Sequence, residues 1–199
     1  MTRVLLASRN AKKLAELRRI LAPSLPEVEV LGLDDVPPYD EVPETGATFA
    51  DNALLKAREG FAHTGLATVA DDSGLAVEAL NGMPGVLSAR WSGRHGDDLA
   101  NLELVLAQLA DTPDCRLGAA FVCAVAFVDA HGEVVVDGRM DGRLVRTPRG
   151  QNGFGYDPIF VPAGLELTSA ELDSDRKDQI SHRGNALRAL VPHLLDRLP

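Results

Sequence analysis

Apolar and polar positions in the first part of the chain follow the order strand, turn, helix, strand. Residues 3–7, RVLLA, form a short apolar run, and the polar segment SRNAKK comes directly after it. Leu14, Leu17 and Leu21 then recur at the spacing of one helical face, and Pro23 ends the pattern. EVEVLGL alternates like a second strand. This β-α-β opening predicts an α/β fold.

An acidic, proline-rich loop and a capped helix come next. The loop covers residues 34–47. Thr48, with Asp51 three residues later, is a capping-box pattern that predicts a helix from about residue 49 to 62. The strand LATVA, residues 66–70, follows and is expected to end at the segment DDSG.

The second half of the chain predicts a helix, a long hairpin and a helical end. NGMPGVLSARWSGRHG is rich in glycine and predicts a loop, followed by a helix from about residue 98 to 110. The expected apolar stripe of that helix is Leu99, Leu102, Val105, Leu106 and Leu109. CRLGAAFVCAVAFVDAHGEVVVDGRM predicts two strands joined at DAHG as an antiparallel hairpin, and IFVP a short strand. The chain closes with helical character over residues 168–198, where the last stripe is Leu187, Leu190 and Leu194.

Length and charge narrow the class of protein. A chain of 199 residues, 45% of them hydrophobic, suits one domain or two closely packed lobes with a real core. No apolar run approaches the roughly 20 residues that span a bilayer, and no signal-peptide core is visible, so we expect a cytoplasmic protein without a membrane partner. The net charge of −9 argues against nucleic acid as a partner but leaves room for a small anion. Cys115 and Cys123 match no zinc pattern and are expected to be buried small residues.

The turn SRNAKK is the first candidate for chemistry. Its residues are Ser8, Arg9, Asn10, Ala11, Lys12 and Lys13. A strand–helix turn presents free backbone N–H groups to an anion. Cations at the start of a helix oppose its dipole unless a ligand offsets them, which favours a phosphate site. The turn lacks the glycine spacing of a Walker loop or a dinucleotide fingerprint, and a solvated helix start is the alternative.

Carboxylates form the second candidate. Asp71 and Asp72 follow the strand LATVA, and the preceding loop carries Asp34, Asp35, Asp40, Glu41 and Glu44. Ligands of open α/β sheets usually bind where strands end, and one or two carboxylates completed by substrate phosphates suit Mg²⁺. A local Asx turn explains DDSG equally well, and exposed loop acids are common. Neighbouring side chains of an extended segment point to opposite sides, so Asp71 and Asp72 should have different surroundings.

Two further clusters lie near the end of the chain. In NGFGYDP, residues 152–158, two glycines allow close approach and two aromatic rings offer flat faces to a base or sugar. A tight turn with two core aromatics explains the same pattern. In KDQISHRG, His182 and Arg183 stand at an expected helix start, where an anion or a base edge could bind. Together the four clusters indicate a site that binds a nucleoside phosphate with a metal.

Five motifs in this order resemble the inosine/xanthosine triphosphate pyrophosphatases, also called non-canonical purine NTP pyrophosphatases. The motifs are ASRNAKKLAEL, ETGATFADNALLKA, ADDSGLAVEALNGMPGVLSARWSG, GFGYDPIF and ISHRGNAL. The resemblance covers residues 1–199 and implies a single domain: a long curved mixed β-sheet with flanking helices, in two lobes around a central cleft, and usually a homodimer. It implies hydrolysis of ITP, dITP or XTP to the nucleoside monophosphate and pyrophosphate, which clears deaminated purines from the nucleotide pool.

The resemblance also implies a role for each candidate residue. Residues 8–13 would bind phosphate; Ser8 replaces the Thr often seen there, and Arg9 occupies a position that is often small. Glu44 and Asp72 would bind Mg²⁺, and Asp72 would also accept the proton of the attacking water. Other implied substrate contacts are Ser73, Phe154, Gly155, Tyr156 and Asp157, with Lys177, His182 and Arg183 reading the purine and Lys56 near the phosphates.

Two other functions fit the same residues. One is a pyrophosphatase for another unusual nucleotide, such as a modified pyrimidine. The other is a sensing module that binds a nucleotide without hydrolysing it, and retention of both Glu44 and Asp72 argues against this reading. A pocket of hydrogen-bond donors would favour a 6-oxo purine over adenine, whereas the rejection of guanine does not follow from the sequence.

Overall fold

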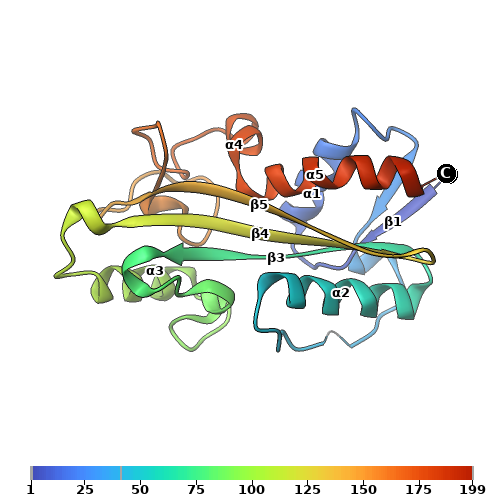
Figure 1. Cartoon of the computed structure of the whole chain (residues 1–199), viewed down its shortest axis with the longest axis horizontal. Helices are drawn as coiled ribbons and strands as arrows, with labels where there is room; N and C mark the ends of the chain where they lie inside the picture. Colours follow the sequence, from blue (N-terminus) through green and yellow to red (C-terminus); the bar gives the residue numbers. More distant parts are fainter. Residues whose placement is uncertain (1, 41, 199) are drawn as a thin grey trace. The chain divides into compact units, whose positions relative to one another are not determined.

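The computed structural model describes residues 2–40 and 42–198, which form an α/β fold on a mixed sheet (Figure 1). The strands are β1 (Thr2–Leu6), β2 (Val28–Leu31), β3 (Ala67–Val77), β4 (Gly118–Asp129), β5 (Gly132–Leu144) and β6 (Phe160–Pro162). Their order in the sheet is β2-β1-β3-β4-β5-β6. β1 pairs in parallel with β2 and β3, whereas β5 and β6 are antiparallel. The predicted fold class, a mixed sheet with flanking helices, is confirmed.

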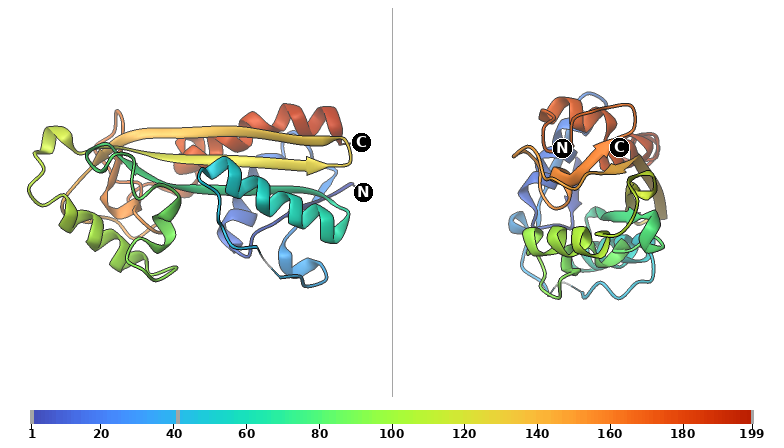
Figure 2. Two further views of the ribbon diagram at one scale, coloured as in Figure 1. Left: turned by 60° about the horizontal axis from the view of Figure 1, so that its bottom comes forward. Right: turned by 90° about the vertical axis from the view of Figure 1, so that its left-hand side faces the viewer.

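Helices flank the strands on both sides. They are α1 (Ala11–Leu21), α2 (Phe49–Thr64), α3 (Asp98–Gln108), α4 (Ser174–Ile180) and α5 (His182–Arg197). Figures 1 and 2 show α2 and α5 on opposite sides of the strands. α2 begins at the predicted capping box, in which the Thr48 hydroxyl accepts from the Asp51 N–H and the Asp51 carboxylate accepts from the Thr48 N–H. The predicted start of this helix is therefore confirmed, because local hydrogen bonds decide it.

The chain packs as two compact units. Unit 1 comprises the chain up to Asp72, Cys123–Gly138 and the chain from Arg183 onward, and unit 2 comprises Ser73–Val122 and Arg139–His182. Unit 1 has one apolar cluster under α1 and α5 and another under α2. Unit 2 has its own cluster, built on α3 and the adjoining parts of β3, β4 and β5. Each unit therefore has the apolar core that it needs to hold polar side chains in fixed positions.

β3 is longer than its sequence pattern predicts. The expected end at Ala70 is wrong, because the strand continues through DDSG to Val77. The Asx-turn interpretation of DDSG is wrong for the same reason. Asp71 and Asp72 therefore lie inside a strand and not at its end, and both are buried. A strand can carry two buried carboxylates only when neighbouring elements supply partners for them.

Other differences from the predicted pattern concern the ends and surfaces of elements. The expected glycine-rich loop contains a 3-10 helix, η3 (Gly85–Arg90), and residues 168–173 are not helical. Leu99, placed on the buried stripe of α3, is 65% exposed because it lies in the first turn, beyond the apolar cluster. Cys123 is buried as expected, but Cys115 is exposed on the short helix η4 (Asp114–Arg116).

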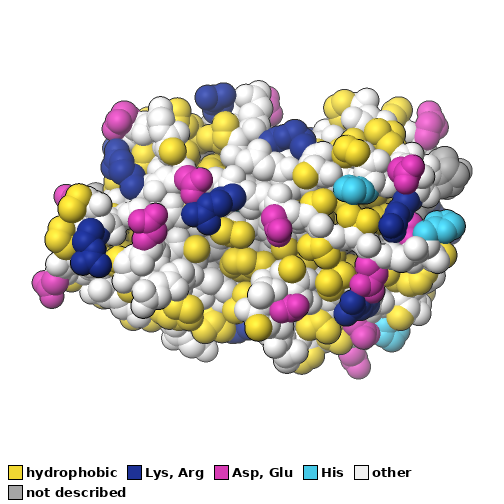
Figure 3. All heavy atoms as spheres, viewed as in Figure 1, with side chains coloured by type: hydrophobic (Ala, Val, Ile, Leu, Met, Phe, Trp, Pro, Cys, Tyr) yellow, Lys and Arg dark blue, Asp and Glu magenta, His cyan; other side chains and the backbone are white. Residues whose placement is uncertain are grey.

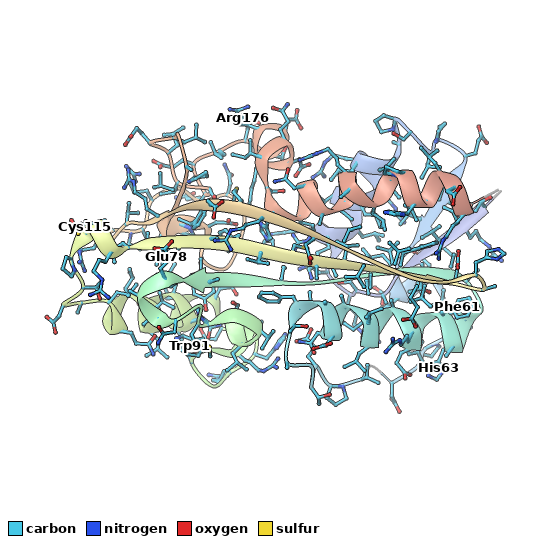
Figure 4. All side chains as sticks on the ribbon, viewed as in Figure 1. Phe61, His63, Glu78, Trp91, Cys115 and Arg176 are labelled. Carbon is cyan, nitrogen blue, oxygen red and sulfur yellow. The ribbon has the colours of Figure 1, made fainter. Side chains whose placement is uncertain are left out.

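Charged side chains of both signs are interspersed on the face drawn in Figure 3. Trp91, labelled in Figure 4, lies beside α3, and its indole N–H donates to the Gln108 side chain at 2.8 Å.

Within residues 2–40 and 42–198, none of the helices is both long enough and apolar enough to cross a membrane.

Gly74 in the DDSG motif gives a stability prediction. A Cβ atom at this position would lie 2.5 Å from the carbonyl oxygen of Gly85 and would also collide with the Ser88 hydroxyl. That hydroxyl cannot move freely, because it accepts from the Leu75 N–H at 2.9 Å and donates to Gly85 at 2.7 Å. We expect Gly74→Ala to lower the free energy of unfolding by about 1–3 kcal/mol, measured by urea denaturation.

The control for this prediction is Gly82→Ala, where a Cβ would meet nothing within 4 Å and only the positive φ of 82° is strained. Its expected loss is smaller, about 1 kcal/mol. A Gly74→Ala variant as stable as the wild-type chain would contradict the packing argument.

Candidate functional site

The first polar cluster of unit 1 surrounds Asp71 and joins α1, β3 and α5. The Lys13 ammonium lies 2.8 Å from Asp71 Oδ2, and the Arg183 Nε donates to the same oxygen at 3.1 Å. Arg183 Nη1 also donates to Glu16 Oε2 at 3.2 Å. We call Lys13, Glu16, Asp71 and Arg183 the Asp71 cluster. Two acids and two bases compensate one another there, so the cluster can be buried without a net charge.

The ion pairs decide the protonation states in this cluster. Burial by itself would raise the pKa of Asp71, but attraction to Lys13 and Arg183 outweighs burial and holds that pKa well below its usual range. Burial by itself would lower the pKa of the Arg183 guanidinium, but attraction chiefly to Asp71 outweighs burial and raises that pKa, so the group stays charged. Cys123 lies under the cluster, and burial raises the pKa of its thiol, so it stays protonated and unreactive.

A second cluster of unit 1 surrounds Asp72, on the side of β3 that faces α2. Asn52 Nδ2 donates to Asp72 Oδ2 at 2.9 Å. The Lys56 ammonium, one turn further along α2, lies 2.8 Å from Glu44 Oε1 and 3.8 Å from Asp72 Oδ1. We call Glu44, Asn52, Lys56 and Asp72 the Asp72 cluster. Asp71 and Asp72 therefore face opposite sides of the strand, as the alternation of an extended chain requires.

Asn52 connects the acidic loop to the strand. Its amide donates to Asp72 through nitrogen and accepts from the Gly46 N–H through oxygen, at 2.7 Å. A Cβ at Gly46 would lie 2.7 Å from that amide oxygen, so only glycine leaves room for this contact. The loop is thereby held where Glu44 and Asp72 share one ammonium group.

Protonation in the Asp72 cluster differs from that in the Asp71 cluster. Burial raises the pKa of Asp72 above its ordinary value, and the nearby Lys56 and Asn52 only partly offset this effect. Burial would lower the pKa of Lys56, but attraction to Asp71, Asp72 and Glu44 outweighs it and raises that pKa. Asp72 is therefore a stronger proton acceptor than an ordinary aspartate, which suits a general base.

The two carboxylates of the Asp72 cluster fit a hard divalent cation. Glu44 and Asp72 already share one positive group, and oxygen ligands are those that Mg²⁺ prefers. Among the described residues no group of three or more His, Cys, Asp or Glu side chains could hold a metal. Mg²⁺ commonly takes only one or two carboxylates and completes its shell with water and substrate phosphates. Of the loop acids, Asp34 pairs with Arg9 at 3.4 Å, and Glu41 lies outside the described residues.

The turn SRNAKK is more self-contained than its sequence predicts. The Asn10 side-chain oxygen accepts from the N–H groups of Lys12 and Lys13 at 3.0 and 3.3 Å, and Ser8 Oγ accepts from the Asn10 N–H at 3.2 Å. The expectation of free backbone N–H groups is therefore wrong for these three residues, because Asn10 is the N-cap of α1. The turn still brings Lys13 to the Asp71 cluster.

In unit 2, residues 153–157 form what we call the aromatic turn. Asp157 is buried, and its Oδ2 accepts from the Phe154 N–H at 2.9 Å and from the Lys177 ammonium at 2.5 Å. The same ammonium lies 5.6 Å from the centre of the Phe154 ring. Gly153 has a φ of 76°, and a Cβ there would collide with Asp157 and Lys177. The turn therefore places one aromatic ring, one cation and one carboxylate together.

The two aromatic residues of this turn have different surroundings. Phe154 is 39% exposed, whereas Tyr156 is 4% exposed and donates its hydroxyl to the Ser88 carbonyl at 2.9 Å. Burial, with the charge of Asp98, raises the pKa of Tyr156, so the phenol remains a donor. The expectation of two faces open to a base is wrong for Tyr156, whose ring belongs to the core of unit 2. Phe154 is the ring with an accessible face.

The remaining predicted substrate contacts lie on α5, α4 and β3. His182 is buried and stacks on Phe121, with ring centres 4.9 Å apart and an angle of 14°. Arg183 is 5% exposed and belongs to the Asp71 cluster of unit 1. Lys177 lies on α4 with Asp157, and Ser73 is half-buried in β3. The structure thus associates Lys177 with the aromatic turn and Arg183 with Asp71.

Sequence patterns missed Glu16, Asn52 and Asp98. Asn52 and Lys56 are four residues apart on one face of α2, and Lys13 and Glu16 are three apart on α1, so helical spacing could have found both pairs. No local spacing in the sequence indicates the partner of Asp98. Its partner, the Gly155 N–H, is 57 residues away in sequence, and only the folded chain brings them to 2.9 Å.

Comparison with known proteins gives consistent results. The family model described as the Ham1 family matches residues 4–193. A dITP/XTP pyrophosphatase of Mycobacteroides abscessus is 67% identical over 194 residues, covering 96% of this chain and 94% of the relative. One of Nocardia farcinica is 65% identical over 196 residues, with coverages of 98% and 95%. The solved structure of the Staphylococcus aureus Ham1 protein matches with a TM-score of 0.88 and 38% identity, covering 98% of this chain and 99% of that one.

Proposed function

This chain belongs to the Ham1 family, and from that premise we infer that it hydrolyses non-canonical purine nucleoside triphosphates. Its substrates are dITP, ITP and XTP, and its products are the nucleoside monophosphate and pyrophosphate. The reaction removes deaminated purines from the nucleotide pool. The observation that carries this proposal is the carboxylate pair of Glu44 and Asp72 around one ammonium group, with Asp72 held by Asn52.

Asp72 is the catalytic base of the proposed reaction. It takes a proton from water, and the water oxygen bonds to the α-phosphorus. The bond from the α-phosphorus to the α–β bridging oxygen breaks, and pyrophosphate leaves with that oxygen. The bond from Asn52 fixes one carboxylate oxygen, and the raised pKa of the buried carboxyl favours proton uptake. Glu44 and Asp72 are the residues that would hold Mg²⁺, which as a Lewis acid would neutralise charge developing on the phosphates.

Residues of unit 1 carry the proposed phosphate contacts. These are Ser8, Arg9, Asn10, Ala11, Lys12 and Lys13. Ser73, which belongs to unit 2, is a further proposed substrate contact. Asp71 supports this assignment, because it holds the Lys13 ammonium at 2.8 Å in a buried cluster. Lys56 offsets the charges of Glu44 and Asp72, which keeps two neighbouring carboxylates from repelling each other.

Residues of unit 2 carry most of the proposed nucleoside contacts. They are Phe154, Gly155, Tyr156 and Asp157, with Lys177 and His182 as further purine contacts. The exposed Phe154 ring supports base stacking, and the Lys177 ammonium is a donor that favours a 6-oxo group over an amino group. Arg183 is assigned to the purine by resemblance, and its ion pairs with Asp71 and Glu16 support a second task, holding Asp71 in place.

Product analysis tests this proposal. We expect the purified chain with dITP and Mg²⁺ to release dIMP and pyrophosphate in equal amounts, resolved by ion-exchange chromatography. EDTA should abolish turnover and added Mg²⁺ should restore it, because the phosphates and carboxylates would otherwise repel each other.

Two outcomes would overturn the proposal. Release of dIDP and orthophosphate would exclude this bond cleavage, and binding without turnover would indicate a sensing module. A panel of dITP, XTP, dGTP, dATP and a modified pyrimidine triphosphate at matched concentrations tests the substrate class. Preference for the pyrimidine would move the chain to the alternative pyrophosphatase activity.

We further propose that the chain acts as a cytoplasmic homodimer without nucleic acid or a membrane as partner. The net charge of −9 supports the absence of nucleic acid. Light scattering in solution tests the dimer, since one chain has a mass of 21.2 kDa and the dimer has twice that mass.

A further inference from the structure

The backbone of the aromatic turn is left-handed on both sides of Phe154. Gly153 and Gly155 flank this residue, and both have positive φ, 76° and 61°. Glycine has no side chain that could lock such a conformation, so the turn depends on hydrogen bonds to hold the ring. Hydrogen bonds to the two peptide groups beside Phe154 therefore hold the backbone that carries the ring.

Each of these two peptide groups is held by a carboxylate. The Phe154 N–H donates to Asp157 Oδ2 at 2.9 Å, within the turn. The Gly155 N–H donates to Asp98 Oδ2, also at 2.9 Å, on helix α3 of the same unit. Hydrogen bonds to charged acceptors are stronger than neutral ones, so the pair of contacts is a clamp on both sides of Phe154.

Asp98 stands on a firmly held part of α3. It is the first residue of the helix, where a negative side chain is favourable to the helix dipole. The next turn is anchored by Asn101, which is 2% exposed, accepts from the Ser92 N–H at 2.7 Å and donates to the Ala89 carbonyl at 3.2 Å. Leu102 and Val105 of the same helix are buried in the core of unit 2.

We propose that Asp98 is a positioning residue for nucleoside binding: by holding the Gly155 N–H it fixes the Phe154 ring on which the base stacks. The inference rests on the proposed function, because the turn meets a purine only if the chain binds such nucleotides. Asp98 takes no part in proton transfer, which belongs to the Asp72 cluster. Its removal should therefore weaken binding of the nucleoside part and leave the chemical step unchanged.

The decisive variants are Asp98→Ala, which removes the acceptor, and Asp98→Asn, whose amide oxygen can still accept from Gly155. We expect Asp98→Ala to raise KM for dITP about three- to tenfold, the usual effect of one lost hydrogen bond, with kcat within about twofold. Asp98→Asn, which keeps the acceptor but loses its charge, should have a KM between those of the wild-type chain and Asp98→Ala. Glu103→Ala is the control, since it removes an exposed charge from the same helix without touching the turn.

Binding of dIMP and of pyrophosphate distinguishes a positioning role of Asp98 from a general disruption of the site. We expect Asp98→Ala to weaken binding of dIMP by the same factor as KM, measured by calorimetry, and to leave binding of pyrophosphate unchanged. Hydrogen exchange supplies a test that needs no substrate. The Gly155 amide should exchange faster in Asp98→Ala, whereas the Phe154 amide, held by Asp157, should keep its rate.

Several results would overturn the inference. These are an unchanged KM and dIMP affinity in Asp98→Ala, equal weakening of dIMP and pyrophosphate, or a loss confined to kcat. Failure of the proposed function is distinguishable: the wild-type chain would then bind dIMP without hydrolysing dITP, and the Asp98 effect on dIMP would remain. A wild-type chain that does not bind dIMP overturns both.

Discussion

Replacing Asp72 by asparagine is expected to lower kcat for dITP by at least about a hundredfold, the contribution typical of a general base. Asparagine has the same shape but cannot take a proton from water. The substitution also removes one of the two carboxylate charges, those of Glu44 and Asp72, that would hold Mg²⁺. Steady-state kinetics with saturating dITP and Mg²⁺ measure this effect.

The fold should survive this substitution. Lys56 keeps its contact of 2.8 Å with Glu44, and the asparagine oxygen can still accept from Asn52. Thermal unfolding should therefore change little. Asp137→Asn on the exposed side of β5 is the matched control, because the same chemical change there touches neither cluster. An Asp72→Asn variant that retains wild-type turnover would show that another residue is the base.

Replacing Asp71 by alanine should instead destabilise the fold. The side chain is 3% exposed, and its loss leaves Lys13 without this ion pair and Arg183 with Glu16 as its remaining carboxylate in the cluster. Removing one partner of a buried ion pair typically lowers the free energy of unfolding by about 3–5 kcal/mol. For a chain of this size we expect a fall in Tm of roughly 6–20 °C, measured by calorimetry.

Glu133→Ala is the matched control for burial. Glu133 accepts two hydrogen bonds from Arg58 at 2.7 Å each, but the two side chains are 39% and 52% exposed. An exposed pair of good geometry contributes at most about 1 kcal/mol. If Asp71→Ala destabilises the chain no more than Glu133→Ala does, burial does not strengthen the Asp71 cluster.

The contribution of Asp71 should depend on pH in a definite direction. Its pKa in the folded chain lies below its usual range, because attraction to Lys13 and Arg183 outweighs burial. A carboxyl of this kind binds protons more readily when unfolded, so its stabilisation is complete above the unfolded pKa of about 4. It is lost as the pH falls from there through the folded pKa. The stability difference between wild type and Asp71→Ala should therefore shrink below about pH 4.

Much of the fold could be predicted because short-range patterns decide it. The capping box of Thr48 and Asp51, the stripe of Leu187, Leu190 and Leu194 and the hairpin at DAHG are all local signals, and the structure confirms each. Their energetics involve residues within one or two turns, so the sequence contains the relevant partners. The same holds for the opposite orientation of Asp71 and Asp72 on an extended chain.

Contacts between distant segments could not be read in this way. DDSG is a typical turn sequence, yet it is extended within β3, where α1, α5 and α2 bring cations and an amide to the two carboxylates. Nothing near Arg183 in sequence indicates that it pairs with Asp71, 112 residues away. Tyr156 and Phe154 are alike in sequence, yet one packs in the core and the other is accessible.

The sequence by itself therefore determined the α/β class, the main elements and the resemblance that identifies the family, because periodicity and motif order are local or linear properties. Only the tertiary structure decided which charges pair: Asp71 with Lys13 and Arg183, Asp72 with Asn52 and Lys56, and Asp98 with the Gly155 N–H. The physical reason is that a buried charge requires a compensating partner at a few ångströms, and folding, not sequence distance, determines which group is there.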